Sequence, residues 1–394
     1  MKLVITIWNV LQMVIGYNLV MPLVLNLICF FRKTPTDSPS LLNKGEADFA
    51  IIVTAYEQTD LLPAVIDSIL KINYTNYLVY IVADKCDISM LNFFSNKVIL
   101  LRPEETLGSN TRSHFYAIRN FKRQHERLAI VDSDNLVHPE FINQLNIFFE
   151  SNYEAVQGVR MAKNLNTTYA CLDAARDIYY HYYDGKLLFN AGSSATLAGS
   201  GMAFTTSLYK QCLEHQDITG AGFDKVLQYE IVKNGRRIAF APNALVFDEK
   251  TTNPDQLVKQ RSRWINTWFR YFGFGFKLLG IGLVKFDWNN MLFGLTLLRP
   301  PLFIFLLLSV FFMAVNIILS PIVAALWLLG ILLFIAGFFI ALSHAETDQR
   351  IYRSLSNIPK FIFYQVKSLI KTRKANSYSV ATRHIYTEDI KASQ

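Results

Sequence analysis

Two aspartates stand one residue apart where an apolar run of the chain stops. In "LAIVDSDNLVHPEF", Leu128 to Phe141, these are Asp132 and Asp134. Two neighbouring carboxylates can share a divalent cation, and Mg²⁺ prefers one or two carboxylates together with phosphate oxygens from a substrate. The pair therefore predicts a site for a metal ion and a diphosphate. A solvated turn is the competing interpretation, because two aspartates at this spacing also occur by chance.

Two other apolar runs end in side chains that suit a nucleotide. "AIIVTAYEQ" ends with Tyr56 and Glu57, where an aromatic ring could stack on a base. "VADKCD" contains Asp84, which could accept a hydrogen bond from a base or a ribose. Together they predict a nucleotide beside the acidic pair.

Further along the chain, two glycines and another aspartate are candidates for the same site. "ATLAGSGMAF" brings Gly199 and Gly201 together, which permits close approach of a ligand to the backbone; a simple turn explains the pair equally well. Asp224, in "GAGFDKVLQYEIVKNGRRIAF", stands just inside a predicted helix. It is either an N-terminal helix cap or a catalytic base. The stretch "QRSRWINTWFRYF" then places Gln260, Arg263 and Trp264 on one face of a helix.

The elements that must position these residues alternate between strands and helices. Apolar, β-rich runs at 49–56, 77–87, 97–103 and 127–134 predict strands, and amphipathic runs at 59–72 and 110–124 predict helices. This alternation predicts an α/β domain with a mostly parallel sheet. Ligands of such open sheets bind beyond the carboxyl ends of the strands, where the acidic residues and Tyr56 are expected.

Three apolar stretches are long enough to cross a bilayer, which takes about 20 residues. They run over 3–31, 291–319 and 321–344, and the last two are expected to form a helical hairpin. The predicted organisation is a transmembrane helix over 1–31, a linker over 32–48, a soluble domain over 49–264, an amphipathic interfacial segment over 265–290, a transmembrane hairpin over 291–343 and a basic tail over 344–394.

The formal net charge of +8 raises the question of a nucleic-acid partner. The basic residues, however, flank the apolar stretches, so the rule that positive loops stay inside accounts for them. It predicts an integral protein of the plasma (inner) membrane, with its N-terminus outside and its soluble domain cytoplasmic, and no nucleic acid. The four cysteines form no CxxC pair, which favours reduced thiols over a disulfide framework or a zinc site.

The order of these motifs resembles that of the membrane-integrated, inverting family 2 glycosyltransferases, the group of cellulose, chitin and hyaluronan synthases. That group shows an aspartate after the second strand, a DxD, a later aspartate before a helix, and QxxRW. Here these are Asp84, "DSD" from Asp132, Asp224 and "QRSRW" from Gln260. The resemblance covers about 49–264, and "YSVATRH" in the tail resembles a gating loop of such enzymes.

The resemblance implies a GT-A fold that uses a nucleotide-diphosphate sugar, with a UDP-sugar favoured, and Mg²⁺ or Mn²⁺. Asp132 and Asp134 would hold the metal, with Asp134 the preferred direct ligand, and Asp224 would deprotonate the acceptor. Donor contacts would come from Thr54, Tyr56, Glu57, Asp84, Asp132, Asp134 and Arg112. Contacts to the acceptor and diphosphate would come from Gly199, Gly201, Gln260, Arg263 and Trp264.

This sequence departs from the family pattern at two positions. Phe223 stands where glutamate often precedes the later aspartate. The lysine that often follows the third strand is absent; Asn110 lies nearby and Arg112 is a candidate substitute.

Three functions remain open from the sequence. The first is a processive synthase that extends a β-linked polysaccharide and exports it, with homo-oligomers or secretion partners completing a channel. The second is a single addition to a lipid-linked acceptor. The third, a non-catalytic nucleotide-binding membrane protein, is disfavoured because all the acidic motif positions are filled.

Overall fold

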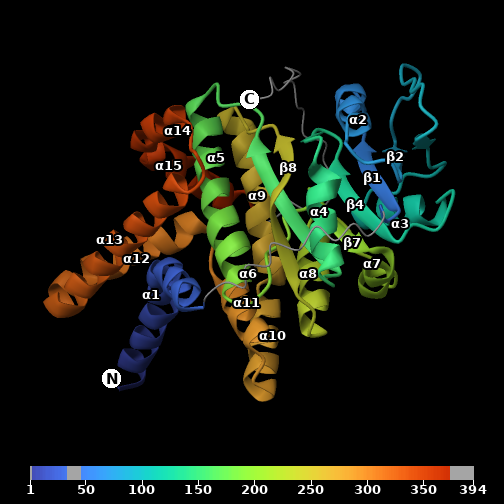
Figure 1. Ribbon diagram of the computed structural model, residues 1–394. Helices are drawn as coiled ribbons and strands as arrows, with labels where there is room; N and C mark the ends of the chain where they lie inside the picture. The colour runs from blue at the N-terminus through green and yellow to red at the C-terminus, as the bar shows by residue number, and fades with distance from the viewer. Residues whose placement is uncertain (1, 33–45, 373–394) are drawn as a thin grey trace.

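The computed structural model describes residues 2–32 and 46–372 (Figure 1). They include an eight-stranded sheet in the order β3-β2-β1-β4-β7-β6-β8-β5. Strands β1, β2, β3 and β4 run parallel, as do β6 and β8, whereas β7 is antiparallel to β4 and β6, and β5 to β8. The strands are β1 Phe49–Tyr56, β2 Tyr77–Asp84, β3 Val98–Leu101, β4 Arg127–Asp132, β5 Leu136–Val137, β6 Ala155–Ala162, β7 Met202–Thr205 and β8 Ile238–Asp248. The predicted α/β, GT-A-like fold is confirmed.

Helices cover both faces of this sheet. Because successive side chains of a strand point to opposite faces, neighbours in β1 enter different cores: Ile51 packs with α2 and α4, and Ile52 with α3, α7 and α8. These helices are α2 Leu62–Leu70, α3 Asn110–Arg119, α4 Phe141–Glu150, α7 Thr206–Leu213 and α8 Phe223–Lys233. Since β1 is buried on both faces, its sequence is a nearly continuous apolar run.

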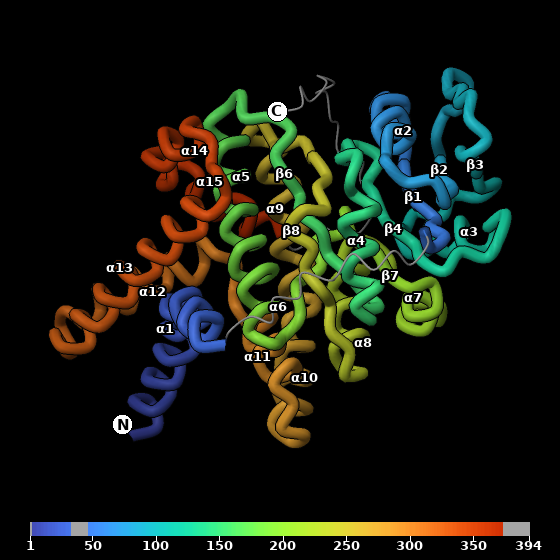
Figure 2. The backbone as a smooth tube through the Cα atoms, viewed as in Figure 1, coloured from blue at the N-terminus to red at the C-terminus, as the bar shows by residue number. Residues whose placement is uncertain are grey.

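Three helices are long and apolar enough to cross a membrane: α1 Lys2–Phe31, α12 Leu302–Leu319 and α13 Pro321–Ser343. They lie together at one side of the sheet domain (Figure 2). The second is shorter than predicted, because the backbone leaves the helix at Arg299-Pro300-Pro301 and a separate helix, α11 (Trp288–Leu298), precedes it. Proline removes a backbone donor and disfavours helix at the residue before it, which accounts for the break.

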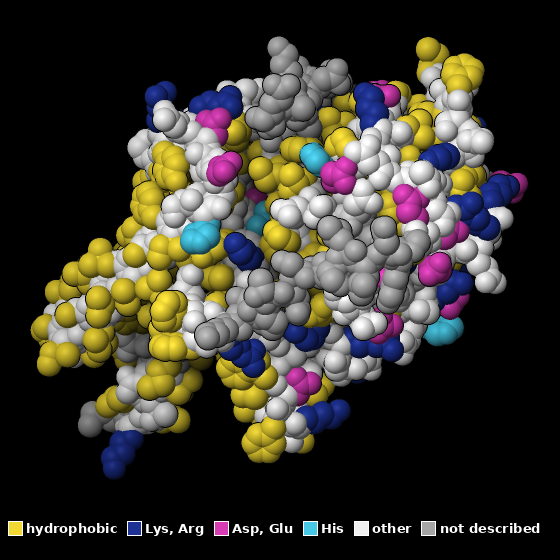
Figure 3. All heavy atoms as spheres, in the orientation of Figure 1, with side chains coloured by type: hydrophobic (Ala, Val, Ile, Leu, Met, Phe, Trp, Pro, Cys, Tyr) yellow, Lys and Arg dark blue, Asp and Glu magenta, His cyan; other side chains and the backbone are white. Residues whose placement is uncertain are grey.

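The segment predicted to lie on the membrane surface, 265–290, is divided among three helices. Helix α9, Pro254–Tyr271, runs through the predicted domain limit at 264, and α10, Gly273–Lys285, pairs with α11. Glycine makes the close approach of α10 to α11 possible, because a Cβ on Gly282 would lie 2.6 Å from the Met291 nitrogen. Apolar side chains gather over α12 and α13 and at the free end of α10 (Figure 3), where Phe286 is 91% exposed.

A tyrosine-rich stretch joins the sheet domain to the membrane helices. Helix α5, Thr168–Tyr180, continues as a π-helical turn, His181–Leu187, and a short α6, Leu188–Asn190. Tyr183 donates a 2.8 Å hydrogen bond to the Gly337 carbonyl of α13, and Tyr182 donates one of 3.1 Å to the Asn26 side chain of α1. After α13, the chain forms α14, Gln349–Ser354, a 3₁₀ turn, Leu355–Asn357, and α15, Ile358–Ile370, which packs along α9. The predicted gating-loop segment "YSVATRH" and most of the predicted linker lie outside the described residues.

Candidate active site

A cavity of about 650 Å³ lies at the carboxyl edge of the parallel strands. Thr54 and Tyr56 reach it from the end of β1, and Asp132 and Asp134 from the end of β4. The parallel register pairs Thr54 with Asp132, so adjacent strands deliver both groups to one place. The structure therefore brings these four residues together at one edge of the sheet.

Within the cavity, the two aspartates lie close enough to influence each other's charge. Burial and, second, the nearby charge of Asp134 raise the pKa of Asp132 to about 7. Hydrogen bonds fix the turn: the Asp132 amide donates to Ser200 Oγ over 3.0 Å, and Asn135 Nδ2 donates to Asp134 Oδ1 over 3.1 Å. Such a pair fits a divalent cation whose remaining ligands are water and phosphate oxygens. Among the described residues, no group of three or more His, Cys, Asp or Glu offers a metal cage built of protein alone.

The loop over 196–201 forms one wall of the cavity and is held from beneath by buried amides. Gln157 Oε1 accepts from the Ala198 amide at 2.9 Å, and Gln228 Oε1 accepts from the Leu197 amide at 3.1 Å. Gly199 lines the cavity with φ of +88°, and a Cβ there would meet no atom within 4 Å. Gly201, the last residue of the loop, packs away from the cavity instead, where a Cβ would lie 2.8 Å from Val246. Of the two glycines, Gly199 therefore lines the cavity, and Gly201 is needed for close packing against Val246.

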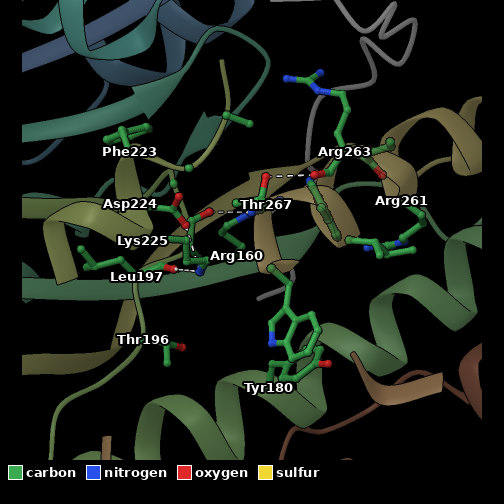
Figure 4. Close-up of a pocket in the computed structure, with 18 of the residues that line it drawn as sticks. Arg160, Tyr180, Thr196, Leu197, Phe223, Asp224, Lys225, Arg261, Arg263 and Thr267 are labelled. Atoms are coloured by element: carbon green, nitrogen blue, oxygen red, sulfur yellow. Dashed lines mark hydrogen bonds and ion pairs between the residues drawn. The ribbon is translucent and has the colours of Figure 1, made fainter. Parts of the chain in front are cut away.

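Asp224 faces the same cavity from the first turn of α8 (Figure 4). The N-cap of α8 is Gly222, in a left-handed conformation with φ of +113°, so Asp224 is not the cap. Lys225 Nζ lies 3.0 Å from Asp224 Oδ2 and donates to the Leu197 carbonyl at 3.2 Å. The carboxylate is therefore held beside the 196–201 loop.

The "QRSRW" residues line the cavity from α9. Gln260 Oε1 accepts a 3.1 Å hydrogen bond from Thr251, and burial lowers the pKa of Arg263. Two guanidinium groups contact the Trp264 ring, that of Arg261 at 4.0 Å from the ring centre and that of Arg176 at 4.5 Å. Such contacts orient an indole by cation–π attraction.

A buried network of charges supports Trp264, and the sequence did not reveal it. Asp173 binds Arg261 and Arg176; Asp177 binds Arg176 and Lys250; Asp248 binds Lys250 and Arg160. Four of these groups also line the cavity: Arg160, Arg176, Asp248 and Arg261. The one available signal was the run of charges at 173, 176 and 177 on an otherwise apolar α5.

Four residues expected at the site do not line the cavity: Glu57, Asp84, Arg112 and Gly201. Both carboxylate oxygens of Asp84 accept backbone N–H groups, from Leu107 at 2.9 Å and Gly108 at 2.8 Å, so this side chain fastens the loop after β3. Glu57 pairs with Lys85 at 2.7 Å on the surface. Arg112 points to Asp217, at 2.8 Å, and its neighbour Asn110 lines the cavity instead.

Comparison with known proteins shows a family match and similar solved structures. Residues 47–267 match the family model described as glycosyltransferase-like family 2, which is more than half of the chain. Among solved structures, a mannosyltransferase from Pyrobaculum calidifontis in complex with GDP-Man and Mn²⁺ is 13% identical, with a TM-score of 0.48 over 91% of this chain and 97% of that one. TarS of S. aureus in complex with UDP-GlcNAc is 15% identical, with a TM-score of 0.43 over 83% of this chain and 90% of that one. No curated protein sequence matches significantly.

The matched region begins just before β1 and ends within α9, so it contains the acidic pair, Asp224 and the "QRSRW" helix. The chain therefore belongs to the family 2 glycosyltransferases, enzymes that transfer a sugar from a nucleotide-sugar donor.

Proposed function

We propose that this protein is an inverting, metal-dependent transferase that moves a sugar from a nucleotide-diphosphate sugar, a UDP-sugar being favoured, to an acceptor hydroxyl at the membrane. The observation that carries the proposal is that Asp224 shares one cavity with the Asp132–Asp134 pair. A base and a diphosphate site must face the same reacting carbon for this chemistry.

In the proposed reaction, the acidic pair holds the donor. Asp132 and Asp134 would bind Mg²⁺ or Mn²⁺, and Thr54 and Tyr56 would contact the nucleoside. A bound cation would neutralise charge on the leaving nucleoside diphosphate. Arg263, which lines the same cavity, would add a positive group where negative charge develops.

Asp224 is the proposed base. Its carboxylate would take the proton of the acceptor hydroxyl as that oxygen attacks the anomeric carbon from the side opposite the diphosphate. One such displacement turns an α-linked donor into a β-linked product. Trp264, which lines the cavity and is oriented by two guanidinium groups, would contact the acceptor sugar.

The primary acceptor we propose is a growing β-linked polysaccharide, as the "QRSRW" helix suggests. A lipid-linked acceptor that receives one sugar is the second candidate, and one observation favours it: the cavity extends to Leu302 and Phe303, in the first turn of α12. The three apolar helices of the described chain would anchor the enzyme in the plasma membrane with the sheet domain cytoplasmic. Export of a polymer would then need a homo-oligomer or secretion partners.

The decisive experiment uses the full chain in nanodiscs with a panel of nucleotide sugars and Mn²⁺ or Mg²⁺, following nucleoside-diphosphate release and product size. Metal-dependent release from one donor, lost in Asp224→Asn and abolished by EDTA, would support the proposal and name the sugar. Long products would support the polysaccharide and single additions the lipid-linked acceptor. Equal release by the wild type and Asp224→Asn would refute the role of Asp224.

A further inference from the structure

Helix α15 packs along α9 with one of its sides. Phe361 and Ser368 on that side are buried, and Gln365, one turn from each, lines the active-site cavity. Because residues three and four apart share one side of a helix, these three residues define an inner face. The inner face of α15 therefore forms part of the cavity wall.

The opposite side of α15 combines positive charge with apolar side chains. Phe363 is 56% exposed and Ile370 is 79% exposed. The exposed residues on this side follow the same helical spacing and end at the C-cap of the helix. We name them the outer face of α15: Lys360, Phe363, Lys367, Ile370 and Lys371. The helix itself, "IPKFIFYQVKSLI", contains no Asp or Glu.

The lysines of the outer face are not neutralised by the part of the protein that the structure describes. Within residues 2–32 and 46–372, none of the three forms an ion pair with a carboxylate. Lys367 and Lys371 line a recess of about 220 Å³ between α9 and α15, and Asp255 of α9 lines it too. Two ammonium groups face one carboxylate there, so the charge of the recess favours an anionic group.

The course of the chain places α15 beside the membrane. Helix α13, which is long and apolar enough to cross a bilayer, ends at Ser343, and α14 begins at Gln349. Helices α14 and α15 lie together at that end of α13 (Figure 1). Residues 344–372 contain five Lys or Arg and two Asp or Glu. A basic segment that directly follows a membrane span and exposes apolar side chains is typical of binding to anionic lipids.

From these observations we infer that the outer face of α15 binds anionic lipid headgroups of the leaflet from which α13 emerges, and so holds the part of the cavity wall that Gln365 forms. The lysines would contact the headgroup phosphates, and Phe363 and Ile370 would enter the boundary between headgroups and acyl chains. Each basic side chain close to an anionic leaflet strengthens binding about fivefold. The binding requires only that α13 crosses a membrane, whereas its effect on the cavity rests on the proposed function.

The first test needs no turnover. A spin label is attached through Ser356→Cys, an exposed position one turn before Lys360. The full chain also carries Cys29→Ser, because the other three cysteines are buried. In nanodiscs, collisions of the label with oxygen, which concentrates in the bilayer, are compared with collisions with a water-soluble nickel complex. We expect the oxygen-to-nickel ratio to rise at least threefold when one third of the phosphatidylcholine is replaced by phosphatidylglycerol.

Two variants with the same change of net charge show whether the outer face is responsible. The outer-face variant should lose the rise, and it combines Lys360→Gln, Lys367→Gln and Lys371→Gln. The control variant should keep it, and it changes three exposed basic residues at the ends of α2 and α3, across the sheet domain from α13 (Figure 1): Lys71→Gln, Arg119→Gln and Lys122→Gln. An equal rise in both variants would overturn the inference. So would a wild-type ratio that is the same in both lipid mixtures, which would assign this face to water or to another protein, such as a second copy of the chain.

The second test measures the effect on the cavity. Nucleoside-diphosphate release is followed in the same two lipid mixtures for the unlabelled wild type and both variants. We expect kcat/KM of the wild type and the control variant to be at least threefold higher with phosphatidylglycerol, and that of the outer-face variant to be the same in both mixtures. Equal kcat/KM of the wild type in the two mixtures would overturn the link between headgroups and cavity. Absence of release in both would count against the proposed function, and the spin label would then decide the inference alone.

Discussion

The guanidinium of Arg261 lies 4.0 Å from the centre of the Trp264 ring and is bound to Asp173, a carboxylate of α5. The same aspartate binds Arg176 at 3.1 Å, and Arg176 is the second guanidinium group that contacts the ring. The orientation of Trp264 is therefore set by a different helix from the one that carries it. This relationship makes the position of the Trp264 ring depend on Asp173, a residue that does not line the cavity.

Replacing Asp173 with Asn should destabilise the fold, because it leaves two buried guanidinium groups without their shared carboxylate. Removal of one partner from a buried ion pair costs about 3–5 kcal/mol. Denaturant unfolding in a fixed detergent would measure the loss. The control is Asp67→Asn, which breaks an exposed pair with Lys71 and should cost less than about 1 kcal/mol. Similar losses in the two variants would contradict the structural role of the network.

Gly222→Ala should disturb both stability and activity. Gly222 has φ of +113°, and a Cβ there would lie 2.4 Å from the Tyr271 ring, so either that ring or the start of α8 must move. We expect a loss of about 1–3 kcal/mol together with a fall in kcat, because Asp224 moves with the helix. At the other end of α8, Gly235 has φ of +75° with no atom near its Cβ position. Gly235→Ala should therefore lower stability and leave turnover unchanged; a normal kcat in Gly222→Ala would argue against this coupling.

Asp224→Asn should lower kcat by about 10²–10⁴, the range of general-base contributions, while binding of UDP with Mn²⁺ stays within about twofold of the wild type. The amide cannot take a proton from the acceptor but keeps the shape of the side chain. Isothermal titration and steady-state kinetics would separate binding from turnover. Glu230→Gln is the control, since Glu230 is an acid of the same helix that pairs with Lys233 at 3.3 Å and should leave kcat unchanged.

Asn110 and Arg112 should differ in their effect on the donor. Asn110 lines the cavity, whereas Arg112 is engaged by Asp217 on the surface. We expect Asn110→Ala to raise the donor KM several-fold and Arg112→Ala to leave it within about twofold. A larger rise in donor KM for Arg112→Ala than for Asn110→Ala would instead support Arg112 as the donor contact that the sequence predicts.

Local sequence determined much of this protein. Continuous apolar runs set β1, β2 and β4, because strands buried on both faces must be apolar throughout. The three long apolar stretches set α1, α12 and α13, although only the Arg299-Pro300-Pro301 break decided where α12 begins. Asp132, Asp134 and Asp224 were identifiable because the first two follow directly on an apolar strand and the third begins a helix.

Only the tertiary structure decided which candidates meet. Residues two apart on a helix point in different directions, so the packing of α3 sends Asn110 into the cavity and Arg112 out of it. The ion pairs under Trp264 join residues 160, 173, 176, 177, 248, 250 and 261, which are charged positions without local periodicity. Their burial becomes favourable only when β6, α5, β8 and α9 converge, because each charge then finds a partner that its own segment does not supply.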